Sequence, residues 1–218
     1  MGTRNLTVVV LDGETKVAQY GQWDGYPSGA GVKILAALKR ALDEDFDDFR
    51  EKVRSTSFIS HEEIQRRWKE MGADDSGFVT MDISKAMAEK YPQLQRDMGY
   101  NIINHLIDSA PGQELDNSIN FAADSLFCEY AYVVDLDTNT LEVYRGFNKA
   151  PLGSEERFAS FFSTEGQEHR NPDDLYYPVR LWRTFELSDL PDEEAFLETL
   201  NENEEDEDDT PSASGVKI

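Results

Sequence analysis

Two segments with the pattern of a β-hairpin lie far apart in this chain of 218 residues. The first joins residues 5–11, which are apolar and rich in β-branched side chains, to residues 15–22 through an Asp-Gly pair. Such a pair between two strand-like runs favours the tight turn of a hairpin. The second joins residues 127–134 to residues 140–147 through a polar turn. The chain between the hairpins is therefore an insertion within the sheet that they form.

The segment between the hairpins has the spacing of amphipathic helices. Its apolar residues recur every three or four positions, and Ser60 with Glu63 forms the capping-box pattern that begins a helix. The expected helices span residues 30–42, 43–53, 60–71, 82–91 and 93–109. We expect Asp82 to be the N-cap of the fourth. After the second hairpin, residues 154–162 are expected to be helical, and residues 176–187 alternate as a final strand.

These elements predict an α+β fold, with an antiparallel sheet made from two hairpins and a C-terminal strand, and with an inserted helical block. We expect a single α+β domain over residues 1–190. A short acidic helix should follow over residues 191–200. Residues 201–218 have almost no apolar content, so we expect a disordered acidic tail there.

The chain is strongly acidic, with a formal net charge of -23. Residues 192–218 contain eleven Asp or Glu and one Lys, a charge of -10, which leaves -13 on the rest of the chain. Direct nucleic-acid binding is not expected, because neutralising phosphates requires clustered Lys and Arg. An acidic body suits a basic protein partner, including a surface that normally holds nucleic acid, although it also serves solubility alone.

Composition also restricts the compartment. No window approaches the ~18 consecutive apolar residues of a membrane span, and the first residues lack the apolar stretch of a signal peptide. Cys128 is the single cysteine, so neither an internal disulfide nor a cysteine metal cluster can form. We expect a soluble, cytoplasmic protein that contacts no membrane.

The segment Trp23–Gly31 is the candidate site. It follows the first hairpin, contains three glycines and leads directly into a helix. A glycine-rich turn at a helix start can present backbone N–H groups to a small anionic ligand. Hairpin register places Arg4 at the end of the hairpin from which this segment leaves, where Arg4 could add positive charge. The expected ligand-binding residues are Arg4, Trp23, Asp24, Tyr26, Gly29 and Gly31. The alternative is a connection with Trp23 and Tyr26 packed beneath it.

The N-terminal residues Met1–Arg4, the hairpin and Trp23–Gly31 resemble an uncharacterised family of phage, bacterial and fungal proteins. Residues 93–99 and 128–137 resemble further segments of that family. The resemblance spans residues 1–187, and its N-terminal motif is the most specific part. It supports the loop as a site and implies no particular reaction.

A more distant similarity is to N-terminal-nucleophile hydrolases, which also begin with a strand. In that case Thr3 would be the nucleophile and its own freed amine the base, with Asp24 or Arg4 as an orienting charge. The departure is that Met1 and Gly2 precede Thr3. Without a further cleavage there is no free Thr3 amine.

Other motifs favour structural roles. Arg96, Asp97 and Gly99 fall within the expected helix 93–109, where a glycine implies close packing or a ligand. Two acidic runs, from Asp43 and from Asp135, lack the glycine that a calcium loop needs at its sixth position.

Neither a metal site nor a cofactor is expected. The three histidines are scattered, and Cys128 in its strand is expected to be a core residue rather than a nucleophile.

The expected function is that of an acidic interaction protein, such as a phage-type inhibitor or nucleic-acid mimic that engages a basic protein surface. The alternative is a binder of small anionic ligands, or an N-terminal-nucleophile-like hydrolase, that uses Arg4 and Trp23–Gly31. The sequence leaves open whether any reaction is catalysed.

Overall fold

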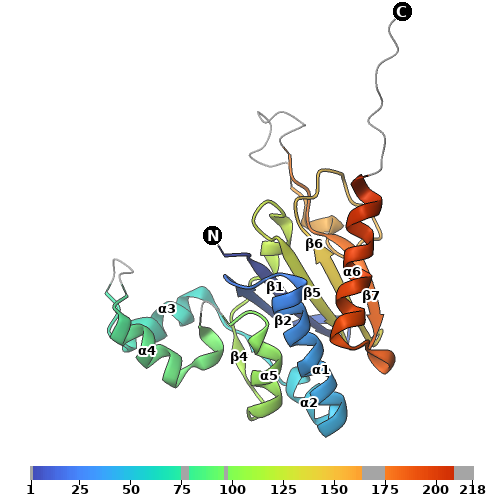
Figure 1. The fold of residues 1–218 in the computed structure, drawn as a ribbon. Coiled ribbons are helices and arrows are strands. Elements are labelled where there is room, and N and C mark those ends of the chain that lie inside the picture. The colour runs from blue at the N-terminus through green and yellow to red at the C-terminus, as the bar shows by residue number, and fades with distance from the viewer. Residues whose placement is uncertain (1, 75–78, 96–97, 164–174, 209–218) are drawn as a thin grey trace, which may run out of the picture.

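A computed structural model describes residues 2–74, 79–95, 98–163 and 175–208 of the chain, with side chains up to residue 201. One five-stranded sheet organises it (Figure 1). The strands are β1 (Asn5–Leu11), β2 (Glu14–Gly21), β5 (Tyr130–Asp135), β6 (Thr140–Arg145) and β7 (Arg180–Glu186). Their order across the sheet is β2-β1-β5-β6-β7.

The α+β class, the two hairpins and the C-terminal strand are confirmed. One strand pair departs from the expected antiparallel sheet, because β1 and β5 pair in parallel. β2 returns the chain to the end of the sheet where β1 and β5 start, and residues 22–129, which contain the helical block, connect β2 to β5 at that end. The helical block therefore leaves and rejoins the sheet at the same end, and the two hairpins meet with their first strands side by side.

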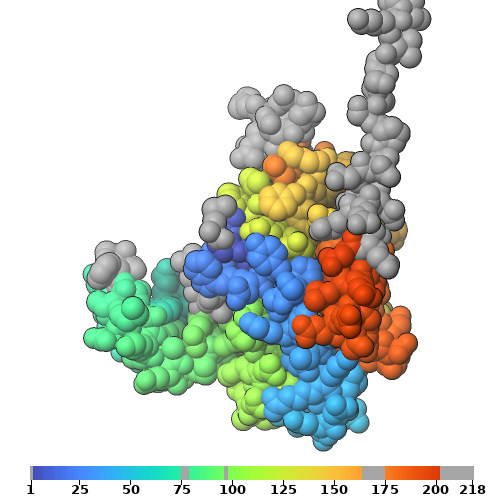
Figure 2. Space-filling view, viewed as in Figure 1, coloured from blue at the N-terminus to red at the C-terminus, as the bar shows by residue number. Residues whose placement is uncertain are grey.

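Four helices cover one face of the sheet. They are α1 (Val32–Glu44), α2 (Phe46–Arg54), α5 (Asn101–Asp108) and α6 (Glu193–Asp208). Their apolar faces meet alternate residues of the central strands, among them the buried Tyr132 and Val134. Figure 2 shows α6 and the segment before α1 covering this face together. Burial of these apolar side chains is the main favourable term that holds the layers together.

The opposite face is covered by irregular segments rather than by helices. The buried residues Leu6, Val8 and Val133 pack there against Phe158 and the 3₁₀ turn Ile119–Ala123. Residues 154–162 were expected to be a helix, but only Ala159–Phe161 form a short 3₁₀ turn. Phe158 is buried, so this segment packs onto the sheet as a loop.

A lateral lobe contains α3 (His61–Glu70) and α4 (Met81–Lys90), which Figure 1 shows beside the sheet. The Ser60 hydroxyl accepts a hydrogen bond from the Glu63 N–H, so the predicted cap is confirmed. The N-cap of α4 is Thr80 rather than Asp82, because the Thr80 hydroxyl accepts from the Ile83 N–H.

The lobe is joined to the sheet layer by a small parallel pair, β3 (Ser57–Phe58) and β4 (Glu114–Leu115), which was not predicted. The buried Arg67 strengthens this connection through ion pairs with Glu63 and Glu114.

The single helix predicted over residues 93–109 is wrong. Its first part is the 3₁₀ turn Pro92–Leu94, and α5 begins only at Asn101. Gly99 has φ +44°, and a Cβ there would lie 2.9 Å from the Gly21 Cα. Its N–H donates to Tyr20 O in β2. Close packing against β2 therefore requires this glycine. Arg96 and Asp97, which were expected in the same helix, lie outside the described residues.

The C-terminal helix is longer than predicted. Residues 191–200 were expected to be helical, but α6 continues to Asp208, into the segment that was expected to be disordered. Phe196 and Leu200 anchor the helix in the core. The expectation for residues 209–218 lies outside the described part of the chain.

Candidate functional site

The segment Trp23–Gly31 is held by its own backbone. The N–H groups of Gly29 and Gly31 donate to Tyr26 O, and the Ala30 N–H donates to Asp24 O. These bonds build the π-helical turn Pro27–Gly31 that precedes α1. The N–H groups that the sequence suggested for an anion are thus already used within the loop.

The glycines of this loop serve close packing. A Cβ on Gly29 would lie 2.4 Å from Asp24 O, and one on Gly31 would lie 3.0 Å from the Phe196 ring. Gly25 O accepts a hydrogen bond of 2.9 Å from the buried Tyr132 hydroxyl. The loop is therefore an architectural joint between the sheet, α1 and α6.

Arg4 lies at the same end of the hairpin, as predicted, because Asn5 pairs with Gly21. Its guanidinium is turned away from the loop, however. The guanidinium carbon lies 4.4 Å from the Phe127 ring centroid, and Nε lies 3.9 Å from a Glu129 carboxylate oxygen. Hairpin register gave the correct position for Arg4 but not the direction of its side chain.

Thr3 is only 3% exposed, and its carbonyl accepts the Gly25 N–H. A nucleophile must be reachable by its substrate. The position of Thr3 beneath the loop counts against the hydrolase hypothesis for the chain with residues 1 and 2 attached. Asp24, Trp23 and Tyr26 are exposed on the surface of the loop.

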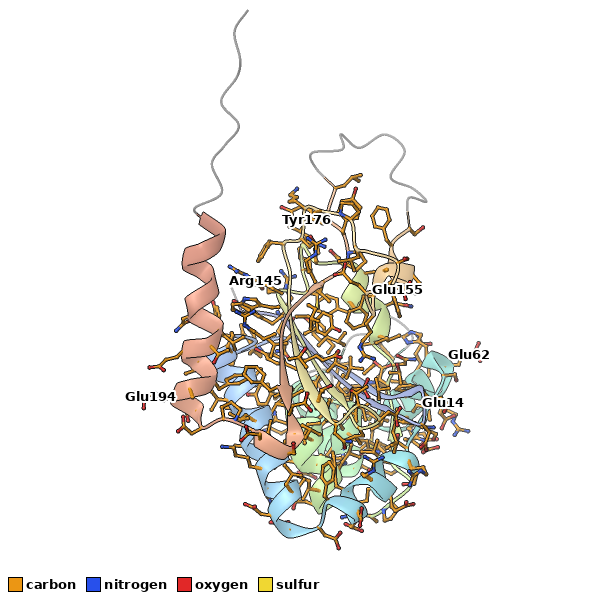
Figure 3. The ribbon with its side chains drawn as sticks, turned by 90° about the vertical axis from the view of Figure 1, so that its right-hand side faces the viewer. Glu14, Glu62, Arg145, Glu155, Tyr176 and Glu194 are labelled. Carbon is orange, nitrogen blue, oxygen red and sulfur yellow. The ribbon has the colours of Figure 1, made fainter. Side chains whose placement is uncertain are left out.

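Strand directions gather several basic side chains at one end of the sheet. The starts of β1, β5 and β7 and the ends of β2 and β6 all lie there. We call this the cationic end, after the residues Arg4, Arg145, Lys149 and Arg180. Among the described residues, Glu129 pairs with Arg4 and Glu156 pairs with Arg180. Figure 3 shows Arg145 and Tyr176 at this end, with Glu14 and Glu194 toward the other.

A pocket of about 400 Å³ opens at the cationic end, between the end of β6 and the start of β7. It is lined by residues 145–150 and 180–182. Arg145, Lys149 and Arg180 are its charged residues, and none of the described lining residues is a carboxylate. Arg145 and Arg180 are direct cross-strand partners. The two basic residues therefore lie side by side at this wall of the pocket.

Hydrogen bonds to neighbouring segments hold the loop that forms the pocket. The Phe147 N–H donates to Ser125 O at 2.7 Å, and the Asn148 N–H donates to the Ser125 hydroxyl. The buried Asn148 amide bridges Pro178 O and the Ala150 N–H. A Cβ on Gly146 would lie 2.2 Å from Cys128 O, so a larger residue would displace the loop. This pocket wall is preorganised rather than shaped by a ligand.

Exposed apolar side chains gather at the same end. Among the described residues, the exposed large apolar side chains at the strand ends of this edge are Trp23, Tyr26, Phe127, Phe147 and Leu181. The rings of Tyr26, Tyr130 and Trp182 follow one another at centroid distances of 6.2 and 6.4 Å. The Arg145 guanidinium lies 5.1 Å from the Trp182 ring centroid. Aromatic and basic groups thus form one continuous surface from the loop to the pocket.

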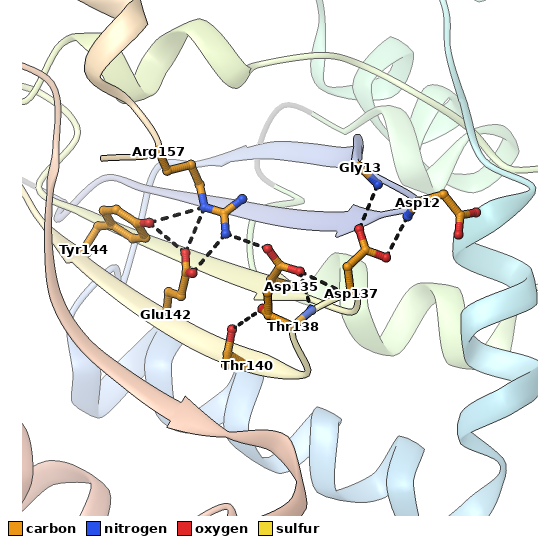
Figure 4. Close-up of polar contacts among 9 residues, drawn as sticks. All are labelled: Asp12, Gly13, Asp135, Asp137, Thr138, Thr140, Glu142, Tyr144 and Arg157. Atoms are coloured by element: carbon orange, nitrogen blue, oxygen red, sulfur yellow. Dashed lines mark hydrogen bonds and ion pairs between the residues drawn. The ribbon is translucent and has the colours of Figure 1, made fainter. Parts of the chain in front are cut away.

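A second polar cluster lies on the face opposite the helices (Figure 4). Arg157 donates to both Glu142 oxygens and to Asp135, at 2.6 to 2.9 Å. Burial alone raises the pKa of Asp135, but the Thr138 N–H and Arg157 outweigh it and lower that pKa below its ordinary value. Because the hydrogen-bonding groups are paired with one another, the cluster is suited to fixing residues 153–162 on the sheet.

Cys128 is fully buried, and burial raises the pKa of its thiol far above the ordinary value. The thiolate needed for nucleophilic chemistry is therefore disfavoured, which agrees with the expected core role. Within the described ranges, no three or more His, Cys, Asp or Glu side chains are arranged to hold a metal ion. Among the same residues, no helix has the length and apolar content that crossing a membrane requires.

Sequence reasoning missed the pocket, although a signal was present. An aromatic residue lies between two basic residues in Arg145–Lys149 and again in Arg180–Arg183. Only the pairing of β6 with β7 brings the two segments together. No protein-family model, curated protein or solved structure matches this chain, so the fold and the pocket are the evidence on its function.

Proposed function

We propose that the pocket at the cationic end binds a small anionic ligand. The observation that carries this proposal is the direct cross-strand pairing of Arg145 with Arg180 on the wall of a pocket that Lys149 also lines. On a chain of net charge -23, three basic residues thus line one pocket. This proposal keeps the anionic ligand expected from the sequence and moves it from Arg4 and Trp23–Gly31 to β6 and β7.

The geometry favours an anion that accepts several hydrogen bonds. Guanidinium groups present a planar set of donors that matches phosphate and carboxylate oxygens. Arg180 also donates to Ala150 O and Pro151 O, so its guanidinium is held by the loop that forms the pocket. Arg145, held against the Trp182 ring, and the exposed Lys149 are the better residues for a test.

The test is calorimetric titration with inorganic pyrophosphate. Replacing Arg145 by Gln, or Lys149 by Gln, should weaken binding by roughly tenfold, because a hydrogen bond to a charged group contributes about 1.5–3 kcal/mol. Lys85→Gln on α4 is the matched control, since it removes the same charge from an exposed position outside the pocket. Undetectable pyrophosphate binding, or equal losses in all three variants, would refute the proposal.

A second proposal concerns the opposite end of the sheet and retains the expected basic protein partner. Exposed carboxylates gather where α1 meets α2, at Asp43, Glu44, Asp45, Asp47 and Asp48. The Arg54–Asp12 ion pair places α2 beside the turn of the first hairpin, away from the cationic end. This separation of charge favours an acidic contact surface for a basic protein.

A defined basic probe tests this second proposal. Polylysine should bind the protein more weakly as salt rises, and Asp43→Asn with Asp47→Asn should reduce binding at low salt. Glu70→Gln with Glu89→Gln in the lateral lobe makes the same change in charge elsewhere. If both double variants lose binding equally, net charge alone is responsible and the surface has no specific role.

A further inference from the structure

The pocket wall carries exposed apolar groups that binding of a bare anion does not require. Phe147 is 54% exposed and Leu181 is 43% exposed, and both line the pocket beside its basic residues. Exposure of such side chains costs solvation free energy, and a ligand that covered them would recover it. The rim is cationic and one wall is apolar, so a ligand that fits both must have two parts.

Phe147 is also held in an unfavourable backbone conformation. Its φ is +54°, in the left-handed region that large side chains rarely adopt. The Ser125 carbonyl and hydroxyl bind the N–H groups of Phe147 and Asn148 and keep the loop in this form. A strained, exposed aromatic side chain that the surrounding structure fixes in place is a feature of ligand sites. In this conformation Phe147 lines the pocket.

We propose that the pocket takes a nucleoside phosphate, with its phosphates on Arg145, Lys149 and Arg180 and its base against Phe147 and Leu181. This inference rests on the proposed anion site. Several cations around one pocket suit the multiple charge of a phosphate chain better than a single carboxylate. Aromatic side chains stack on any base, because every base has a π-face. The pocket volume of about 400 Å³ lies within the range of small-ligand sites.

A mononucleotide also agrees with the charge of the whole chain. A nucleic-acid strand would extend its phosphates past the pocket and along a body of net charge -23, which repels them. A nucleotide places its charge at the cationic end alone. The expectation of no direct nucleic-acid binding is therefore compatible with a nucleotide ligand.

Calorimetric titration of the full chain with ADP, pyrophosphate, adenosine and indole-3-acetate tests this inference. ADP should bind at least about tenfold more tightly than pyrophosphate, because stacking of the base adds to the phosphate contacts. Adenosine and indole-3-acetate should both bind more weakly than ADP. Equal affinities for ADP and pyrophosphate would overturn the nucleotide inference and leave the anion site intact, whereas no binding of either would overturn both. A tighter complex with indole-3-acetate than with ADP would identify an aromatic carboxylate instead.

Two variants remove the proposed contacts with the base while keeping the backbone conformation. Asn tolerates the left-handed backbone, so Phe147→Asn removes the ring while keeping the loop conformation. Leu181→Thr keeps a residue that favours strands on β7. Each should lower affinity for ADP by at least about threefold and leave affinity for pyrophosphate unchanged. Met81→Gln, which removes an exposed apolar side chain from α4, is the control. An unchanged ratio of ADP to pyrophosphate affinity in Phe147→Asn would refute the role of the ring.

Discussion

At the scale of single residues, Tyr132 shows how the loop Trp23–Gly31 is joined to the sheet. Its side chain is fully buried in the helical layer, and its hydroxyl donates to Gly25 O. Burial raises the pKa of this hydroxyl well above its ordinary value, so it stays protonated and keeps donating. This hydrogen bond thus joins the segment that leads into α1 to the sheet.

Replacing Tyr132 by Phe should lower the free energy of unfolding by about 1–3 kcal/mol, because a buried carbonyl loses its donor. Urea denaturation of wild type and variant measures this difference. Tyr100→Phe is the control, since the Tyr100 hydroxyl accepts only an exposed contact from Lys33 and its loss should cost less than about 1 kcal/mol. Equal losses in both variants would mean that the bond to Gly25 is not a special constraint.

At the scale of elements, the irregular segment 153–162 depends on polar contacts for its position. Arg157 joins it to β5 through Asp135 and to β6 through Glu142. The exposed side-chain fractions of Asp135 and Glu142 are only 7% and 14%, so each carboxylate relies on Arg157. Removal of Arg157 would leave two buried charges without their counter-ion.

Arg157→Met should therefore destabilise the fold by about 2–3 kcal/mol at neutral pH. The folded-state pKa of Asp135 is lowered, so its contribution is present above the ordinary value of 3.8 and is lost as pH falls through the folded-state pKa. Wild type should lose stability below pH 3.8, and the variant should lose less over that range.

Urea unfolding across this pH range measures both effects. Arg66→Met is the control, because Arg66 is exposed and pairs with Glu63 at the surface of α3. It should change stability by less than about 1 kcal/mol. A pH dependence in Arg157→Met that equals that of wild type would contradict the proposed role of Asp135.

At the scale of the whole molecule, α6 brings further negative charge toward the cationic end. β7 runs away from the cationic end, and α6 then runs back beside β7 toward that end, as Figure 1 shows. Residues 202–218 contain seven Asp or Glu and one Lys. Negative charge on a chain of net charge -23 opposes the binding of an anion, and salt screens such an interaction over ~10 Å at 0.1 M ionic strength.

Truncation after Asn201 changes the net charge from -23 to -17 and keeps Leu200 in the core. Pyrophosphate should then bind several-fold more tightly at low salt, and the gain should vanish near 1 M salt, where the Debye length is ~3 Å. A full-length variant with these seven carboxylates replaced by amides separates charge from length. Tighter binding in the truncated form alone would exclude the electrostatic explanation.

Local patterns in the sequence determined much of this molecule. Asp12-Gly13 between two apolar runs specified the first hairpin, and Ser60 with Glu63 specified the start of α3. Such features depend on neighbours a few residues away, so local sequence contains the necessary information. Cys128 is buried as expected from the apolar run around it, although β5 begins only at Tyr130.

Only the tertiary structure decided the parallel pairing of β1 with β5, the break at Gly99 and the location of the pocket. Gly99 interrupts its segment because it packs on Gly21, which is distant in sequence. The pocket exists because β6 and β7 pair in a register that sets Arg145 opposite Arg180. The sequence shows which residues are basic or aromatic, whereas long-range pairing decides which of them share a surface, since contacts between distant segments leave no periodic signal along the chain.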